Sequence, residues 1–171
     1  MNTLFTVKVR YTKQNDNGSF KRVTEPYVLA AHTFSDAEAR IYEELGSIIR
    51  GEFNVVSITR TELQDIFIYE NFDVFYKAVV SFDSYDDDGE IKKKQKSSFL
   101  VTASSVKDAN EKMKESLSGW LADYTIDAVS VTPVADFFPF QEVLDKEISR
   151  KPLEETEPED FKQDPAFVDE L

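Results

Sequence analysis

Cysteine is absent from this 171-residue chain, and histidine occurs only once. The lack of cysteine excludes disulfides, thiolate metal sites and cysteine nucleophiles. The sequence has no apolar run of the roughly 18 to 20 residues that a membrane-spanning helix needs, and its N-terminal stretch lacks the continuous apolar run of a signal peptide. We therefore expect a soluble, cytoplasmic protein without a membrane partner.

The net charge of −13 is unevenly distributed along the chain. Residues 151–171 contain 8 acidic and 2 basic side chains, whereas residues 1–67 contain 9 and 8. The part of the chain expected to fold is therefore only mildly acidic. This balance argues against duplex DNA as a partner but permits a local basic surface.

The sequence contains an internal duplication. Residues 5–67, the first copy, and residues 76–138, the second copy, have the same series of motifs 71 to 73 positions apart. A repeat of this kind indicates a repeated structural unit. Matching positions include Gly18 and Gly89, Tyr27 and Phe99, Ala31 and Ala103, Asp36 and Asp108, and Leu45 and Leu117.

Each copy has the pattern of two strands, a helix and a third strand. In the first copy, apolar and polar residues alternate over residues 5–11, and Asn17-Gly18 is typical of a tight hairpin turn. The returning strand spans residues 20–31 and contains Pro26, which suggests a bulge or an edge position because proline cannot donate a hydrogen bond. Residues 53–61 are predicted to form the third strand.

The predicted helices begin at capping residues and have one apolar side. Ser35 and Glu38 suggest a capping box in the first copy, with Gly51 as a stop signal, and Ser105 with Asp108 suggests the corresponding start in the second. The predicted buried stripes are Ala37, Ile41, Leu45, Ile48 and Ile49 in the first copy, and Ala109, Met113, Leu117, Trp120 and Leu121 in the second.

These patterns predict an α+β fold of two tandem ββαβ repeats, residues 1–70 and 71–140, with helices packed on antiparallel sheet. One repeat has too few strands to cover its helix, so we expect the two to share a core around a pseudo-twofold axis. The bridging segments DIFIYENF and DFFPF could each add a short strand or a strap. Residues 141–171 are predicted to form a short helix and an acidic, flexible tail.

Several strings of residues resemble those of a domain-of-unknown-function family found in Bacteroidetes and in the phages that infect them. The strings are VTEPYVL at 23–29, SDAEARI at 35–41, GEFNV at 51–55, DYTIDAVSVTP at 123–133 and DFFPF at 136–140. The resemblance covers residues 3–140 and leaves the tail outside. It implies a bacterial or phage origin and brings no activity, cofactor or catalytic residue.

Two candidate catalytic or metal sites have simpler explanations. A general base at His32 would need an orienting partner and a nucleophile, and Ser104 takes its place in the second copy. The cluster DSYDDDGE at 83–90 is similar to a calcium loop, but Gln95 stands where a bidentate glutamate is required. Aspartate and glycine are also what a hairpin turn needs. The sequence lacks the phosphate-binding patterns GxxxxGK[ST] and GxGxxG. We expect no enzymatic activity, metal, cofactor or small-molecule substrate.

Consecutive basic residues follow each predicted hairpin turn. Together with the nearby aromatic residues Phe20, Tyr27, Tyr85 and Phe99, they could form a groove in which a single nucleic-acid strand stacks its bases on exposed rings. Alternatively, the lysines prevent edge-to-edge strand pairing and the aromatic residues belong to the core. The basic candidates are Lys21 and Arg22 in the first copy and Lys92, Lys93, Lys94 and Lys96 in the second.

The sequence favours a non-enzymatic binding or assembly protein, of the phage or bacterial accessory or structural kind. Such a protein would contact a protein partner, or itself, through strand edges, hairpin arms and the tail. The alternative is a single-stranded nucleic-acid-binding protein with basic hairpin arms and an autoregulatory acidic tail. The candidate anchors in the tail are Phe161, Phe167 and Val168, apolar residues set among acidic ones.

Overall fold

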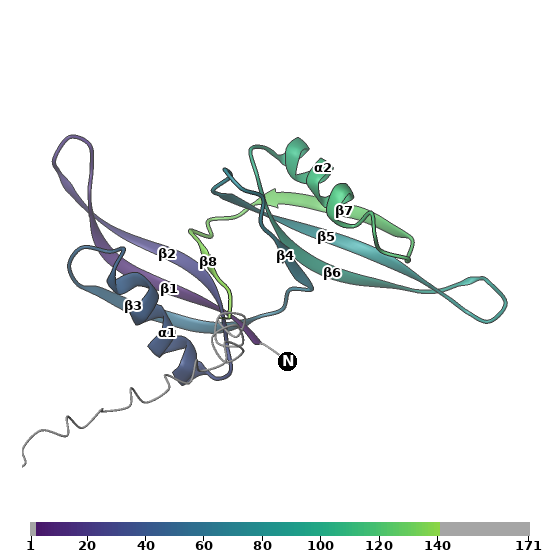
Figure 1. Cartoon of the computed structure of the whole chain (residues 1–171), viewed down its shortest axis with the longest axis horizontal. Coiled ribbons are helices and arrows are strands. Elements are labelled where there is room, and N and C mark those ends of the chain that lie inside the picture. The colour runs from purple at the N-terminus through teal and green to yellow at the C-terminus, as the bar shows by residue number, and fades with distance from the viewer. Residues whose placement is uncertain (1–2, 141–171) are drawn as a thin grey trace, which may run out of the picture. The chain divides into compact units, whose positions relative to one another are not determined.

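The computed structural model describes residues 3–140, apart from the side chain of Lys92. These residues lie in one compact unit, and its two helices and eight strands confirm a mixed α+β fold (Figure 1). The helix expected after Pro139 and the candidate tail anchors lie outside the described residues. The elements are β1 (Thr3–Gln14), β2 (Phe20–Ala31), α1 (Phe34–Gly46), β3 (Phe53–Thr61), β4 (Asp65–Phe67), β5 (Val74–Tyr85), β6 (Ile91–Ala103), α2 (Val106–Ser116), β7 (Tyr124–Val131) and β8 (Phe137–Phe138).

The strands of the described residues form two four-stranded sheets. The first sheet has the order β3-β1-β2-β8, and the second has the order β7-β5-β6-β4. In each sheet three antiparallel strands come from one copy, and the fourth strand comes from the end of the other copy. Thus β8 pairs in parallel with β2, and β4 pairs in parallel with β6. The bridging segments add short strands, as expected, but the sequence did not predict their exchange between the sheets.

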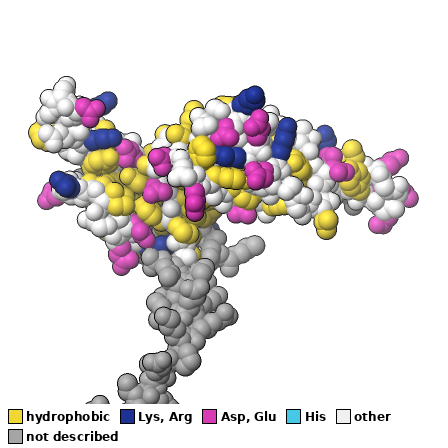
Figure 2. Space-filling model, turned by 45° about the horizontal axis from the view of Figure 1, so that its top comes forward, with side chains coloured by type: hydrophobic (Ala, Val, Ile, Leu, Met, Phe, Trp, Pro, Cys, Tyr) yellow, Lys and Arg dark blue, Asp and Glu magenta, His cyan; other side chains and the backbone are white. Residues whose placement is uncertain are grey.

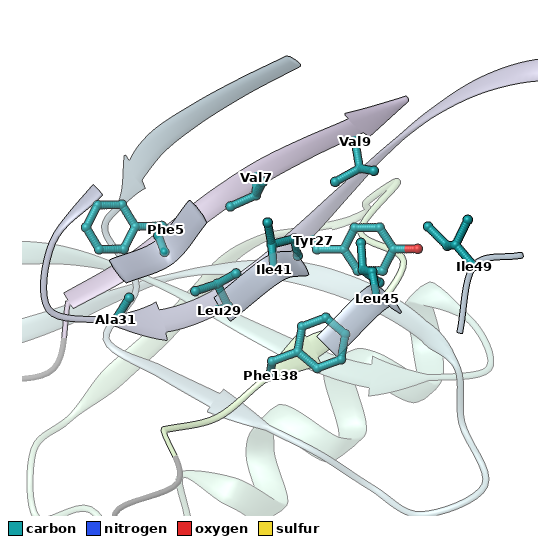
Figure 3. Packing of buried hydrophobic residues seen from close by; sticks show 11 residues of the cluster. Phe5, Val7, Val9, Tyr27, Leu29, Ala31, Ile41, Leu45, Ile49 and Phe138 are labelled. Carbon is teal, nitrogen blue, oxygen red and sulfur yellow. The ribbon is translucent and has the colours of Figure 1, made fainter. Parts of the chain in front are cut away.

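A helix covers one face of each sheet and has its own apolar core. In the first core, alternate residues of β1 and β2 pack against Ile41 and Leu45 of α1, all of them inaccessible to solvent. Phe138 of β8 enters this core and stacks on Tyr27 at 5.9 Å between ring centroids (Figure 3). In the second core, Met113 of α2 packs with residues of β5 and β6, and Phe67 of β4 stacks on Phe99 at 5.6 Å. Each core therefore contains an aromatic side chain from the other copy.

A third apolar cluster lies on the opposite faces of the sheets, because its strand residues alternate with those of the helix-covered cores. Its buried members are Val28 on β2, Phe75 on β5 and Leu100 on β6. Five partly buried residues pack around them, namely Leu4, Leu63, Ile66, Val134 and Phe137. Both sheets therefore contribute side chains to this cluster, whereas each helix is covered by its own sheet and the exchanged strand.

The start of α1 corrects one prediction. The N-cap is Thr33, whose hydroxyl accepts a hydrogen bond from Asp36 N at 3.1 Å, while Asp36 accepts one from His32 N at 2.9 Å. The expected box at Ser35 and Glu38 is therefore wrong, because the reciprocal bonds form two residues earlier. The cap of α2 is confirmed: Ser105 accepts from Asp108 N at 3.0 Å. Thr33 and Ser105 are matching positions of the two copies.

Both helices end earlier than the apolar stripes suggested. Because α1 stops at Gly46 and α2 at Ser116, the residues that follow no longer point along the helical period. Ile48 is 59% exposed, Trp120 is 37% exposed and Leu121 is fully exposed, so their predicted burial is wrong. Ile49 is buried as predicted.

The hairpin turns predicted at Asn17-Gly18 and Asp88-Gly89 are present, and the structure defines their geometry. Residues 15–19 form a loop in which Gly18, with φ 81°, is the only residue with a positive φ, and Gly18 N donates to Asn15 O at 2.9 Å. The corresponding loop has Gly89 with φ 80° and the matching bond from Gly89 N to Asp86 O at 3.0 Å. Pro26 fits the edge interpretation, since β2 is paired with β8 only at Val28 and Leu29.

A cation on each helix contacts the segment that follows the exchanged strand. The Arg40 guanidinium on α1 donates to the carbonyl oxygens of Ala30 and of Pro139, the latter at 3.0 Å, and lies 5.7 Å from the Phe140 ring centroid. At the matching position of α2, Lys112 is buried and lies 2.9 Å from Asp108. Its ammonium also lies 3.0 Å from the ring centroid of Phe72, in the segment between β4 and β5. The two clamps fix the exchanged segments onto the helices.

Replacing Arg40 with methionine should therefore lower the free energy of unfolding by about 1.5 to 3 kcal/mol, the usual contribution of a hydrogen bond with a charged donor. The free energy of unfolding of Arg40→Lys should fall between those of the parent and Arg40→Met, because an ammonium cannot donate to both carbonyl oxygens as the guanidinium does. Urea denaturation measures the difference, and Glu38→Gln on the exposed side of α1 serves as the control, with a change of at most about 0.5 kcal/mol. An Arg40→Met variant as stable as the parent would refute the clamp.

Candidate functional site

The basic residues of the hairpin arms do not gather on one face. The first arm is residues 11–24 and the second arm is residues 82–96; the described basic side chains on both are exposed. Neighbouring side chains of a strand point to opposite faces, so Lys21 and Arg22 face opposite ways, as do Lys93 and Lys94. Lys96 shares a face with Lys94, and the side chain of Lys92 is outside the described part.

The second arm is also acidic. Lys94 lies opposite Asp83 in the strand register, and the tip bears four further carboxylates (Figure 2, at the right). The carboxylate of Asp86 accepts hydrogen bonds from the backbone nitrogens of Asp88 at 3.1 Å and Glu90 at 2.8 Å. This pattern supports the turn interpretation of the tip. Among the described residues, no group of three or more potential metal ligands is present.

The aromatic residues expected beside the basic ones divide into two pairs. Tyr27 and Phe99 are buried in the two helix-covered cores, so bases cannot stack on them. Phe20 is 73% exposed, and Tyr85 is about half exposed. The Tyr85 hydroxyl donates to Asp123 at 2.5 Å, and this hydrogen bond raises the pKa of Tyr85. Only two of the four rings are thus available for stacking.

The outer edges of both sheets are interrupted. Among the described residues, β3 pairs only with β1 and β7 only with β5, so each of these strands lies at an edge of its sheet. The register shifts in the middle of each pairing, so that Val56 of β3 and Asp127 of β7 are extra residues. Asp127 accepts a hydrogen bond from Ser81. Because bulges and charges on edge strands oppose further strand addition, these edges are poor docking surfaces.

His32 is exposed and lies immediately before α1. Its ring packs edge-on against Phe140 with centroids 4.5 Å apart, and its backbone nitrogen donates to Asp36. In the second copy, Ser104 N donates to Asp108 at 2.9 Å in the same way. The backbone at this position thus has the same capping role in both copies, whichever side chain is present.

Exposed apolar side chains are present on both arms and in the loops that follow the two helices. The first apolar site is a groove of about 390 Å³ that includes Phe20 of β2 and Ile48 of the loop after α1. The term second apolar site is used for the exposed apolar residues of the corresponding segments: Ile91 on β6, which is 57% exposed, and Trp120 and Leu121 in the loop after α2. Trp120 stacks on Phe82 at 5.3 Å, whereas Leu121 makes almost no contact. The loop residues continue the apolar stripes of the helices in sequence. Gly46, the last residue of α1, and Gly119, shortly after α2, were the available signals that the helices end here.

The first apolar site has a basic rim, and two of its tyrosines are hydrogen-bonded to Glu25. Lys13 and Arg50 line the groove together with Tyr11 and Tyr27. Both tyrosine hydroxyls donate to one carboxylate oxygen of Glu25, at 3.0 and 3.1 Å. Burial, followed by the hydrogen bond to Glu25, raises the pKa of Tyr11 to about 12. Burial, followed by the charge of Glu25, also raises the pKa of Tyr27.

These shifts predict a loss of stability in alkali. Because the folded pKa values exceed the unfolded value, the stabilisation is fully present below about pH 10 and disappears as the pH rises through about 12. Glu25→Gln should lower both folded pKa values without restoring ordinary ones, since burial is the larger cause. NMR titration of the tyrosine ring carbons measures this. Unchanged titration of Tyr11 and Tyr27 in Glu25→Gln would contradict the assignment.

No helix of the described residues is long and apolar enough to cross a membrane. Searches of curated proteins and of solved structures found no match to the chain. A family model described as domain of unknown function DUF4494 matches residues 3–140, which include both sheets and both helices. The chain therefore belongs to the DUF4494 family.

Proposed function

We propose that this chain is a non-enzymatic binding or assembly protein that contacts a protein partner through its two apolar sites. The observation that supports this most strongly is the exposure of large apolar residues in corresponding segments of both copies: Phe20 and Ile48 in the first, and Ile91, Trp120 and Leu121 in the second. Single exposed apolar residues are common, but groups of them mark interaction surfaces. Apart from Trp120, which stacks on Phe82, these residues lie outside the two helix-covered cores, so packing within the cores does not explain them.

The proposal includes a pseudo-twofold relation between the two repeats, residues 1–70 and 71–140. The matching strand orders support it, and so does the composition of the third apolar cluster. Its members form four pairs of matching positions: Leu4 with Phe75, Val28 with Leu100, Leu63 with Val134, and Ile66 with Phe137. Under this relation the molecule offers one type of surface twice. A partner with two binding segments, or a repeating assembly, would gain affinity from engaging both sites.

Binding of single-stranded nucleic acid has less support. It would require basic and stacking side chains on one exposed face, whereas the basic residues alternate between faces and two of the four rings are buried. The acidic tip of the second arm would also repel phosphates. We therefore place the contact surface at the apolar sites and propose that the basic residues limit unwanted strand pairing. A bacterial or phage origin and a cytoplasmic location complete the proposal.

Two matched double variants of the full chain separate these functions. Phe20→Ser with Leu121→Ser removes exposed apolar surface at both sites, and Lys21→Ser with Lys94→Ser removes one basic residue from each arm. Each variant, tagged and expressed in the organism that encodes the protein, is compared with the parent by native size-exclusion chromatography of the cell extract. The apolar variant should elute as the free protein, while the basic variant should remain in the larger complex.

Thermal unfolding of both purified variants provides the control, since exposed substitutions should change stability by no more than about 0.5 kcal/mol. Elution of the basic variant alone as the free protein, together with loss of the parent's complex after nuclease treatment, would support the nucleic-acid alternative. Elution of the parent as the free protein under all conditions would contradict the assembly proposal.

A further inference from the structure

The first apolar site combines exposed apolar side chains with positive charge. Phe20 and Ile48 supply apolar surface that is open to solvent, and Lys13 and Arg50 line the same groove. No carboxylate is among the residues that line it in the described structure. Glu25 lies nearby but already accepts two tyrosine hydrogen bonds. A segment that carries both apolar side chains and carboxylates would therefore complement this groove.

The end of the second arm is such a segment. Residues 85–91, YDDDGEI, here named the acidic tip, contain four carboxylates and no basic residue. Tyr85 and Ile91 lie opposite each other in the strand register, so their side chains are neighbours, and they are 47% and 57% exposed. Asp86 accepts two hydrogen bonds within the turn, whereas the other three carboxylates are exposed. The acidic tip thus presents an apolar pair beside exposed negative charge.

Charge determines which surfaces of two molecules can meet. Contact between two first sites would bring Lys13 and Arg50 of one molecule against the same residues of the other. Contact between two acidic tips would bring carboxylates against carboxylates. Like charges repel, whereas a basic and an acidic surface attract each other. The combination that charge favours is the first site of one molecule with the acidic tip of another.

We infer that the first apolar site binds the acidic tip of a second copy of this chain. In this contact Ile91 packs beside Phe20 and Ile48, and the exposed carboxylates next to it face Lys13 and Arg50. The inference names the partner of a surface already proposed to bind protein, and it rests on that proposed function. A groove of about 390 Å³ gives a small interface, so the association is weak and depends on concentration.

This contact joins two different surfaces, so it does not end with a pair of molecules. A molecule whose first site is occupied still has a free acidic tip, and its partner still has a free first site. Further copies can then add until a ring closes, or without limit in an open chain. A symmetric dimer, in contrast, uses the same surface on both molecules and stops at two. The inference therefore predicts species larger than a dimer.

Sedimentation velocity of the purified full chain, without other proteins, tests the inference. As the concentration rises, the parent should form dimers and then larger species, and added salt should return it toward the monomer. Lys13→Glu with Arg50→Glu alters the first site, and Asp87→Asn with Ile91→Ser alters the acidic tip. Each double variant alone should associate at least about tenfold more weakly than the parent. An equimolar mixture of the two should form a 1:1 complex that does not grow, because each variant retains the surface that the other has lost.

Two matched control variants place the same kinds of substitution elsewhere. Lys8→Glu with Arg10→Glu makes the same change in charge on the face of β1 opposite to Lys13. Ile68→Ser with Asp73→Asn repeats the tip substitutions at exposed positions outside the arms. Both controls should associate as the parent does.

The inference would be overturned by equal losses in the control variants, or by a mixture that forms no 1:1 complex. A parent that stops at a dimer would show a symmetric contact and would also overturn it. A purified parent that stays monomeric at every concentration would do the same. That last result would leave the proposed function standing if the parent still eluted in a larger complex from the cell extract.

Discussion

Replacing Phe138 with alanine is expected to lower the free energy of unfolding by about 3 to 5 kcal/mol, the usual cost of removing a core phenylalanine. Phe138 belongs to the second copy in sequence, yet its side chain is 8% exposed in the first core and stacks on Tyr27. Its loss would leave a cavity between β2 and α1, and β8 would retain only two paired residues to hold it on the sheet.

The helix that is destabilised by Phe138→Ala shows whether Phe138 packs in the first core or in that of its own copy. Hydrogen exchange should accelerate first in α1, at Ile41 and Leu45, which are nearly 100 residues away in sequence, and less in α2. Ile68→Ala, an exposed position in the corresponding segment of the first copy, is the control and should change stability by no more than about 0.5 kcal/mol. If Phe138→Ala destabilised α2 more than α1, the strand exchange described here would be wrong.

Replacing Leu100 with alanine should cost about 2 to 4 kcal/mol, because Leu100 is 3% exposed in the cluster to which both sheets contribute. Its matching residue, Val28, is in the same cluster, so the two substitutions should not be additive. In a double-mutant cycle with Val28→Ala, urea denaturation should give a coupling energy of at least about 0.5 kcal/mol.

A more drastic substitution at the same position tests how far the cluster joins the two repeats. Leu100→Asp would place an unpaired carboxylate among apolar side chains, and a buried charge without a partner is strongly destabilising. Lys77→Asp, on an exposed position of the neighbouring strand β5, is the matched control for the introduced charge. Strict additivity of Val28→Ala and Leu100→Ala, or equal effects of the two aspartates, would contradict a shared cluster.

The sequence predicted local structure well because its periodicities are short-range. The predicted span of β3, residues 53–61, coincides with the strand, and the start of α2 at Ser105 was predicted from one capping pattern. The exchange of β4 and β8 could not be predicted, because two- or three-residue strands have no periodicity and their partners lie far away in sequence. The same is true of Arg40, whose partner Pro139 is 99 residues away.

The candidate site was missed for a related reason. Ile48, Trp120 and Leu121 continue the apolar stripes of their helices, so a pattern-based reading assigns them to the core. Only the position of the helix ends reveals that these side chains are exposed. The basic residues were recognised from the sequence, but consecutive side chains of a strand point to opposite faces of the sheet, so these residues do not share one surface. Exposure and facing direction, rather than residue type, therefore identify the apolar sites.

Site-specific photo-crosslinking in living cells tests most directly whether the apolar sites are the contact surface. A photoreactive phenylalanine analogue would be placed at Phe20 or Leu121, and at Lys107 or Glu43 as exposed polar controls. We predict a discrete covalent adduct from the two apolar positions and none from the polar ones. Adducts of equal yield at all four positions, or none at Phe20 and Leu121, would contradict the proposed contact surface.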